Sequence, residues 1–493
     1  MTPYLRCLGR PFAMYFDPVV IGFLFGFTMA LAYLIPYAGG LLPFFLAGLI
    51  YVFRKRDWYV RESLVAGFVF ATTYEFFILS WAWDASIYLS SMVIHIPFVL
   101  AALLIFFTLT LISIVAGITF LPWAYVSWKY RFSPIIDLLV LGGVWVACEW
   151  LRIASLSLLS YGDGVLNPPY LSFGMIGYSL ADYPRILSIA SYGGIYALSL
   201  LLVILGGIFF YGFRAVREKK ERVFVIGALV TTVALMCGLI FFGEAKHVPT
   251  TSIPVTLTST YSFPKIPDYT ENLKVAQATT SLVVLPEGSR QFYPLTKTQP
   301  HSLHTGSVVI DSFPFPQKQQ ETVTTPGAFA ISSTSMTLIR EKHALAPYGE
   351  FTPFAMTVLA KLAGFAKTLD QFTYQRHYSP GSYNGSFMYD GIRGSVIFCD
   401  EIAVPNIAKD IVSQTGSNII IAIASTHWFP SGYMLHRETV RMAKVRAVEA
   451  GVPIARSAFG DPAFVVDASG NLLYEGPWGR STVTTVQVPV KAQ

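Results

Sequence analysis

The stretch Met92–Tyr125, MVIHIPFVLAALLIFFTLTLISIVAGITFLPWAY, contains no acidic residue, no lysine and no arginine. A helix needs about 20 such residues to cross the hydrocarbon core of a bilayer. The stretch is long enough to do so, and in water it would expose apolar side chains on every face. It therefore predicts a membrane-spanning segment and makes the first half of the chain the candidate membrane domain.

The composition agrees with that prediction. Hydrophobic residues make up 53% of the 493 residues and charged residues only 13%, which is outside the range of soluble proteins of this length. Further apolar stretches lie near residues 19–36, 40–53, 63–83, 135–160, 187–213 and 223–243. We expect about seven spans, with a transmembrane helical domain over residues 1–245 and a second domain over 246–493.

Basic residues between the apolar stretches predict the orientation. They gather at 54–61, 129–131 and 214–222, whereas the alternate connections near 84–91 and 161–186 hold only Arg185. The positive-inside rule places basic loops in the cytoplasm. Seven spans would then deliver the second domain to the outer face, which in a bacterium is the periplasm. The net charge of +6 is largely accounted for by these loops, so it does not indicate nucleic-acid binding.

From about Ile253 the sequence changes character. Pro, Ser, Thr and Gln become common, and short β-branched runs alternate with helix-compatible segments, which predicts an α/β domain with a largely buried sheet. The runs lie at 281–285, 394–398, 418–422 and 463–466, and the best-supported helix is about 436–450. The sequence contains no internal repeat, no zinc-type spacing of Cys and His, and no glycine-rich phosphate loop.

Cys399 ends the run Ser395-Val-Ile-Phe-Cys399 and is the only cysteine in the second half of the chain. A thiol at a strand-to-helix elbow is placed like a nucleophile. Helix amides pointing at the sulfur would lower its pKa from about 8.5 toward working pH. The alternative interpretation is a small buried hydrophobe, which is what most free cysteines are.

Two further charged residues stand at strand ends or in loops. Glu287 follows Leu-Val-Val-Leu-Pro286, and Lys342 begins the segment Lys-His-Ala-Leu-Ala-Pro-Tyr-Gly-Glu350. A carboxylate can act as general base toward a thiol and later toward an attacking amine. An ammonium group, with the backbone amide that follows the cysteine, can stabilise the oxyanion of acyl transfer. Glu287, Lys342 and Cys399 are therefore the candidate catalytic residues.

These residues, taken in order, resemble a known constellation. Leu-Pro-Glu287, Lys342 followed by Pro-Tyr-Gly-Glu350, and Cys399-Asp-Glu401 look like the Glu-Lys-Cys triad of the nitrilase, or carbon–nitrogen hydrolase, superfamily. With a block of spans in front, the pattern is similar to the apolipoprotein N-acyltransferase family, whose fifth and sixth spans resemble segments 145–152, 177–179 and 194–196. The resemblance implies a polytopic α-helical membrane domain followed by an extracytoplasmic α/β nitrilase-like domain, an αββα sandwich.

The resemblance also implies a reaction. A fatty acyl chain would pass from a phospholipid, commonly phosphatidylethanolamine, to the cysteine as a thioester, and then to the N-terminal amine of a diacylglyceryl-cysteine lipoprotein. The implied location is the bacterial inner membrane with the catalytic domain on the periplasmic side, and neither a metal nor an organic cofactor is implied. Two alternatives remain open: a membrane-tethered amidase or acyltransferase of the same superfamily with another acceptor, and a weakened lipid- or lipoprotein-binding scaffold.

Four residues are supporting or substrate-binding candidates. Glu350 either shares protons with the catalytic candidates or is a solvated loop acid, and Glu401 either anchors the turn below the thiol or stabilises a helix N-terminus. Trp428 either contacts lipid near the site or is a core aromatic residue. Tyr178 lies in the outer connection 161–186, where contact with a lipid headgroup is plausible.

Glu149 and Arg152 are one helical turn apart near the end of a span, where charges are costly without a partner. We expect them to pair, either to shape a lipid entrance or as a structural ion pair. The chain also departs from the family. The residue after Cys399 is usually aromatic and here is Asp400, an acid that would oppose thiolate formation if it faced the sulfur. The sequence as given ends at Gln493, before the C-terminal span that usually follows this domain.

Overall fold

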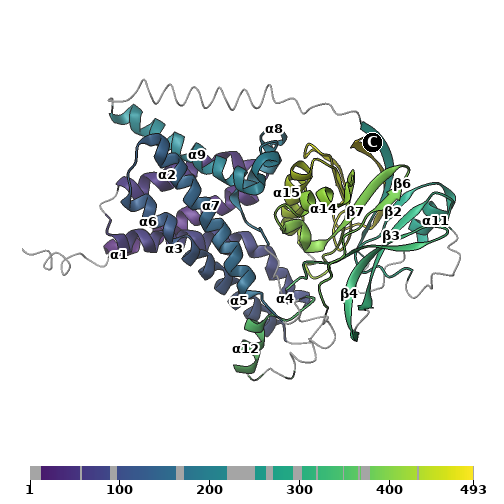
Figure 1. Cartoon of the computed structure of the whole chain (residues 1–493). Coiled ribbons are helices and arrows are strands. Elements are labelled where there is room, and N and C mark those ends of the chain that lie inside the picture. The colour runs from purple at the N-terminus through teal and green to yellow at the C-terminus, as the bar shows by residue number, and fades with distance from the viewer. Residues whose placement is uncertain are drawn as a thin grey trace, which may run out of the picture.

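The computed structural model has a bundle of long helices beside a domain of strands and shorter helices (Figure 1). It describes residues 13–55, 58–88, 97–162, 171–218, 250–261, 270–292, 303–317, 320–347, 349–362, 364, 367, 378–429 and 432–491.

The bundle is made of α-helices joined by short 3-10 turns. Its α-helices are α1 (Ala13–Leu34), α2 (Leu42–Lys55), α3 (Val60–Ile78), α4 (Ala85–Tyr88), α5 (Phe98–Thr119), α6 (Leu121–Lys129), α7 (Pro134–Leu159), α8 (Pro184–Leu187) and α9 (Ala190–Glu218). The 3-10 turns are η2 (Ala38–Leu41), η3 (Leu79–Asp84) and η5 (Ile176–Asp182).

Within the described residues, five helices are long and apolar enough to cross a membrane. They cover the expected spans near 19–36, 63–83, 92–125, 135–160 and 187–213, as Asp17–Leu34, Val60–Ile87, Ala101–Lys129, Pro134–Leu159 and Ala190–Ala215. The expected span at 40–53 is an apolar but shorter helix, Ala38–Arg54. The expected span at 223–243 lies outside the described residues, so the number of seven stays a prediction.

Buried ion pairs join the helices of the bundle. Arg54 of α2 lies 2.5 Å from Asp137 of α7, and both side chains are nearly inaccessible. Arg152 of α7 lies 2.5 Å from Glu75 of α3, again with both side chains buried. Charges in an apolar environment are tolerated when they are paired, and each of these pairs fixes α7 against a different neighbour.

The second domain has twelve described strands and three named α-helices. The strands are β1 (Thr250–Thr260), β2 (Leu282–Val284), β3 (Val308–Gln317), β4 (Gln320–Ile331), β5 (Met336–Glu341), β6 (Phe387–Tyr389), β7 (Ile392–Phe398), β8 (Ile419–Ser425), β9 (Ile454–Phe459), β10 (Phe464–Val466), β11 (Leu472–Glu475) and β12 (Thr482–Lys491). The helices are α11 (Thr270–Ala278), α14 (Ile407–Thr415) and α15 (Tyr433–Ala450), and η6 is a 3-10 turn (Cys399–Ala403). A further helix, α12 (Phe354–Leu362), lies beside the bundle (Figure 1).

The strands form one 12-stranded sheet with the order β5-β4-β3-β2-β1-β9-β8-β7-β6, while β12 pairs with β1, and β10 pairs with β9 and β11. From β3 to β7 in this order, every neighbouring pair of strands is parallel: β3 with β2, β2 with β1, β1 with β9, β9 with β8, and β8 with β7. Carboxyl ends of parallel strands meet at one edge of a sheet, and ligands commonly bind outside that edge. The residues that follow β2, β7 and β8 therefore lie at the same edge of the sheet.

The sheet folds over on itself around an apolar core. In β2 the side chains alternate, with Leu282 and Val284 in the same core cluster as Ile421 of β8, and Val283 in the cluster under α11. In β8 the opposite alternation places Ile420 under α14 and α15. The layers are thus helix, sheet, sheet, helix, and the packing confirms the expected α/β domain of αββα layers.

Helix α15 lies between the sheet and the bundle (Figure 1). Met442, Val445 and Val448 of this helix are buried, and Arg441 and Arg446 are buried as well. The apolar residues of α15 belong to the same core cluster as residues of the bundle. The two domains therefore share one continuous core, and polar contacts such as that between Arg441 and Asp182 also join them.

Candidate active site

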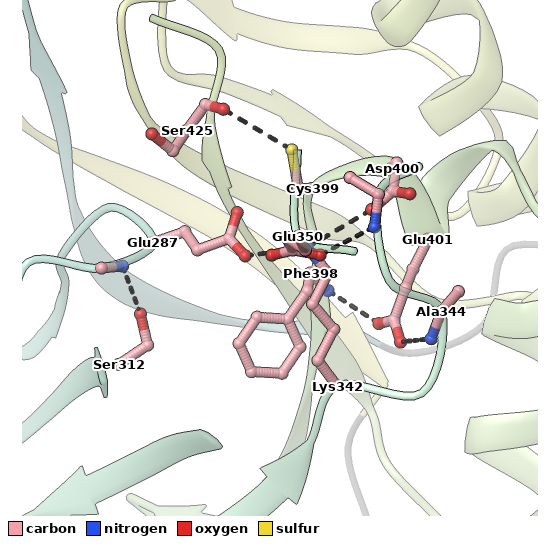
Figure 2. Close-up of polar contacts among 12 residues, drawn as sticks. Glu287, Ser312, Lys342, Ala344, Glu350, Phe398, Cys399, Asp400, Glu401 and Ser425 are labelled. Atoms are coloured by element: carbon pink, nitrogen blue, oxygen red, sulfur yellow. Dashed lines mark hydrogen bonds and ion pairs between the residues drawn. The ribbon is translucent and has the colours of Figure 1, made fainter. Parts of the chain in front are cut away.

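Cys399 begins the turn η6 directly after β7. Its φ angle is +30°, a left-handed value that is uncommon for a residue with a side chain. The turn lifts the thiol out of the strand toward the end of β8, where Sγ lies 3.7 Å from the carbonyl oxygen of Ser425 (Figure 2). Strained backbone of this kind is common at active sites. The elbow predicted from the sequence is present, as a tight 3-10 turn.

Lys342 follows β5 and is the centre of a charged cluster. Its side chain is 1% exposed, and Nζ lies 3.0 Å from Glu287, 2.8 Å from Glu350 and 3.4 Å from Asp400 (Figure 2). Burial alone would lower the pKa of this lysine, but the three acidic side chains raise it well above its ordinary value. The ammonium charge is therefore kept in a water-poor site.

Glu287 follows β2 and contacts both other candidates. Burial raises the pKa of its carboxyl group, Glu350 raises it further, and Lys342 and a hydrogen bond with the side chain of Cys399 act in the opposite direction. A carboxylate that is buried, paired with an ammonium group and in contact with a thiol is placed to accept the thiol proton. The structure thus brings Glu287, Lys342 and Cys399 together from three separate segments.

The expected activation of the resting thiol is wrong. Burial raises the pKa of Cys399 far above its ordinary value, and Glu287 and Asp400 add to the shift, while Lys342 opposes it. The turn η6 is only five residues long, so it has no helix dipole comparable with that of a long helix. The thiol is therefore protonated at rest and depends on a base.

Glu401 lies below the elbow. It accepts hydrogen bonds from both terminal nitrogens of Arg340, from the amide of Phe398 and from the amide of His343. It also accepts one from the amide of Ala344 (Figure 2). Burial would raise the pKa of this carboxyl group, but Arg340 and the amides hold it below its usual value. The contacts join the end of β7 to the segment that carries Lys342.

Two other candidates lie near the cluster. Glu350 bonds to Lys342 through Oε1 and accepts the amide of Ala346 through Oε2, at 2.8 and 2.7 Å. Trp428 is half-buried, and a Cβ atom added at Gly349 would lie 3.6 Å from its ring. Trp428 therefore lies against the loop that carries Glu350.

The candidates in the membrane half lie elsewhere, and two expectations for them are wrong. Arg152 does not pair along its helix with Glu149; it bonds to Glu75 of α3, while Glu149 accepts the amide of Ile176. Tyr178 is completely buried and is not available to a headgroup at the surface. The packing of α3 against α7 places Glu75 beside Arg152, and the spacing of residues within one helix could not indicate this partner.

Tyr178 takes part in a contact that the sequence did not reveal. Its hydroxyl group lies 2.5 Å from Ser172 Oγ and accepts a bond from Arg446 of α15. Ser172 also donates its amide, at 3.0 Å, to the carbonyl oxygen of Ala403, the last residue of η6. The turn that carries Cys399 is thus hydrogen-bonded to the membrane domain.

The described residues contain no group of three or more His, Cys, Asp or Glu side chains arranged to hold a metal ion.

Comparison with known proteins gives a consistent picture for the membrane half. Residues 22–208 match the apolipoprotein N-acyltransferase N-terminal domain. An apolipoprotein N-acyltransferase of Geobacter metallireducens is 23% identical over 67% of this chain and 66% of its own length, and one of Vibrio vulnificus is 22% identical over 75% and 73%. One of Shewanella oneidensis is 28% identical over a shorter region, 30% of this chain and 28% of its own.

Solved structures similar to this one include a CN-hydrolase superfamily protein of Xanthomonas campestris, which is 14% identical with a TM-score of 0.34 and covers 48% of this chain and 91% of its own. A Nesterenkonia amidase of the nitrilase superfamily is 15% identical, with a TM-score of 0.32 over 49% and 93%. The sequence matches span both halves of the chain and all carry one family name. Over up to three quarters of its length the chain is thus similar to apolipoprotein N-acyltransferases, and over residues 22–208 it is similar to the N-terminal domain of that family.

Proposed function

We propose that this protein is a lipoprotein N-acyltransferase that works through a thioester on Cys399. The single observation that carries the proposal is the position of the thiol. Cys399 lies beside a buried carboxylate and a buried ammonium group, and its turn is hydrogen-bonded to the membrane domain through Ser172. A reaction between two membrane-anchored lipids requires such a place, because each acyl chain can stay in the bilayer while its reactive end reaches the sulfur.

The first half-reaction would acylate the cysteine. Glu287 accepts the thiol proton as the sulfur attacks the ester carbonyl of a phospholipid such as phosphatidylethanolamine. Lys342 and the backbone amide after Cys399 stabilise the oxyanion that forms. When the intermediate collapses, the carbon–oxygen bond breaks, the lysophospholipid leaves with a proton, and the acyl group remains on the sulfur as a thioester.

The second half-reaction would transfer the acyl group. The N-terminal amine of a diacylglyceryl-cysteine lipoprotein attacks the thioester, an amide bond forms, and the thiol is regenerated with a proton. The lysine again faces the oxyanion. The supporting residues Glu350 and Glu401 hold the lysine and the turn in place, through the contacts at 2.8 Å to Lys342 and 2.6 Å to Arg340. We further propose a bacterial inner-membrane location with this domain on the periplasmic side, as the basic loops predict.

The test is intact-mass analysis of the purified protein in detergent. Wild type, Cys399→Ser and the matched control Cys148→Ser, whose cysteine is buried in α7, are incubated with phosphatidylethanolamine and then with a diacylated lipopeptide. We expect a hydroxylamine-labile acyl adduct on wild type and on Cys148→Ser, discharged onto the lipopeptide amine, and none on Cys399→Ser. An adduct that leaves only to water would mean a lipid hydrolase. No adduct on wild type would favour a binding scaffold.

A further inference from the structure

Asp400 is a buried acid that the mechanism above does not use. It follows Cys399 in η6, its side chain is 12% exposed, and Oδ1 lies 3.4 Å from Lys342 Nζ (Figure 2). Neither of its oxygens accepts a hydrogen bond within the described part of the chain. A buried carboxylate without hydrogen-bond donors is costly, whereas a protonated carboxyl group in the same place is much less so.

The charges around Lys342 lead to the same conclusion. One ammonium group lies within 3.4 Å of three acids, Glu287, Glu350 and Asp400, so the cluster would carry two uncompensated negative charges if all three were ionised. Like charges that close do not all ionise, and the group with the weakest support keeps a proton. Glu350 accepts two hydrogen bonds and Glu287 accepts one from Lys342, while Asp400 accepts none.

Every acid that faces Asp400 acts in the same direction. Glu350 and Glu287 face it from their loops and Glu401 from its own turn, and Lys342 is the opposing charge. Burial is the largest cause. Burial and the three acids outweigh Lys342 and raise the pKa of Asp400 to about 7. The carboxyl group can therefore hold a proton at rest and release it at working pH, which is what an acid–base catalyst requires.

We propose that Asp400 is a further catalytic residue, a proton donor to the leaving oxygen of the acyl donor and then an acceptor for the proton of the attacking amine. The inference rests on the proposed function and adds one residue to it. It also assigns a use to the position at which this chain departs from the family's usual aromatic residue.

The protons balance over the cycle. In acylation Glu287 takes the thiol proton as the sulfur–carbon bond forms, and Asp400 gives its proton to the lysophospholipid oxygen as the carbon–oxygen bond breaks. In transfer the carbon–nitrogen bond forms and the carbon–sulfur bond breaks. The Asp400 carboxylate then takes the amine proton, and Glu287 returns its proton to the sulfur, so that both acids end as they began.

The leaving group supplies the test. The alkoxide of a lysophospholipid needs a proton, whereas p-nitrophenolate leaves without one. Acylation of Cys399 by phosphatidylethanolamine and by the p-nitrophenyl ester of the same fatty acid is measured on wild type, Asp400→Asn, Asp400→Glu and the exposed control Asp410→Asn. We expect Asp400→Asn to slow acylation by the phospholipid about 100-fold or more, as removal of a general acid does, and not to slow the p-nitrophenolate burst, since Asp400 opposes ionisation of the thiol.

Each outcome has a defined meaning. Partial recovery of the phospholipid rate in Asp400→Glu, which restores a carboxyl group, supports a proton-transfer role. Equal losses with the two donors would overturn the proposal, because an altered shape affects both, and so would an unchanged phospholipid rate. A faster burst in Asp400→Asn with no loss on phospholipid would mean that Asp400 only repels the thiolate. A wild-type protein without any burst would instead refute Cys399 as the nucleophile, and with it the proposed function.

Discussion

The ion pair between Glu401 and Arg340 gives the sharpest stability prediction. Glu401 is completely buried and accepts five hydrogen bonds, at 2.6 and 3.1 Å from Arg340 and at 2.9, 2.9 and 3.2 Å from the amides of Phe398, His343 and Ala344. The change Glu401→Gln keeps the size of the side chain. It removes the only negative charge within salt-bridge distance that the described structure records for the Arg340 guanidinium.

The cost follows from what remains after the change. An arginine that is 1% exposed loses its counter-charge, and breaking a buried pair in this way costs about 3–5 kcal/mol. For a domain of this size that is a fall in Tm of roughly 6–20 °C. The pKa of Glu401 lies below its unfolded value of about 4.3. Its stabilisation is therefore present above that pH and is lost as the pH falls through the folded pKa.

The assay is thermal unfolding in detergent, followed by tryptophan fluorescence, at neutral pH and at about pH 4. Wild type is compared with Glu401→Gln, with the exposed control Asp410→Asn, and with Glu401→Gln combined with Arg340→Met. The double change removes the orphaned charge, so its Tm should lie above that of Glu401→Gln alone. A fall no larger than that of the control, or a double variant less stable than the single one, would refute the reasoning.

Two further predictions follow from the same contacts. Glu287→Gln removes the charge that most opposes ionisation of Cys399, so alkylation by iodoacetamide at neutral pH should become faster than in wild type. Acylation by phospholipid should be lost in the mass assay. Slower alkylation would contradict the assigned cause of the raised thiol pKa. Tyr178→Phe removes the hydroxyl group that accepts from Arg446, so Tm should fall by the equivalent of about 1–3 kcal/mol, and the exposed control Tyr192→Phe should leave it unchanged; equal midpoints for these two variants would show that the buried hydroxyl group contributes nothing.

Local patterns predicted the elements well. The run that ends in Phe398 is β-branched and aromatic and forms β7, and the segment 436–450 has helical periodicity and forms most of α15. Glu287 and Cys399 could be found because each follows a buried strand whose carboxyl end reaches the same edge of the sheet. Each of these features depends on residues that are adjacent in sequence, so it could be predicted from the sequence.

Features that depend on partners from other segments could not be found in this way. The spacing of Glu149 and Arg152 suggested an ion pair, but the arginine pairs with Glu75, which is far away in sequence. The pKa of the Cys399 thiol was expected to fall because the dipole of a following helix was considered, and it rises because burial and two acids outweigh one lysine. Arg446 is fully buried, with Tyr178 of the bundle as a partner that its position in the helix did not indicate.

The shared core around α15 has a consequence for how the protein is made. Synthesis proceeds from the N-terminus, and domains generally fold as units in that order. The bundle helices that cover α15 are complete long before this helix leaves the ribosome, whereas α15 cannot bury Arg441 and Arg446 until it docks on them. The bundle is thus a template on which the last layer of the second domain matures, and a second domain produced alone would leave that layer uncovered and prone to aggregate.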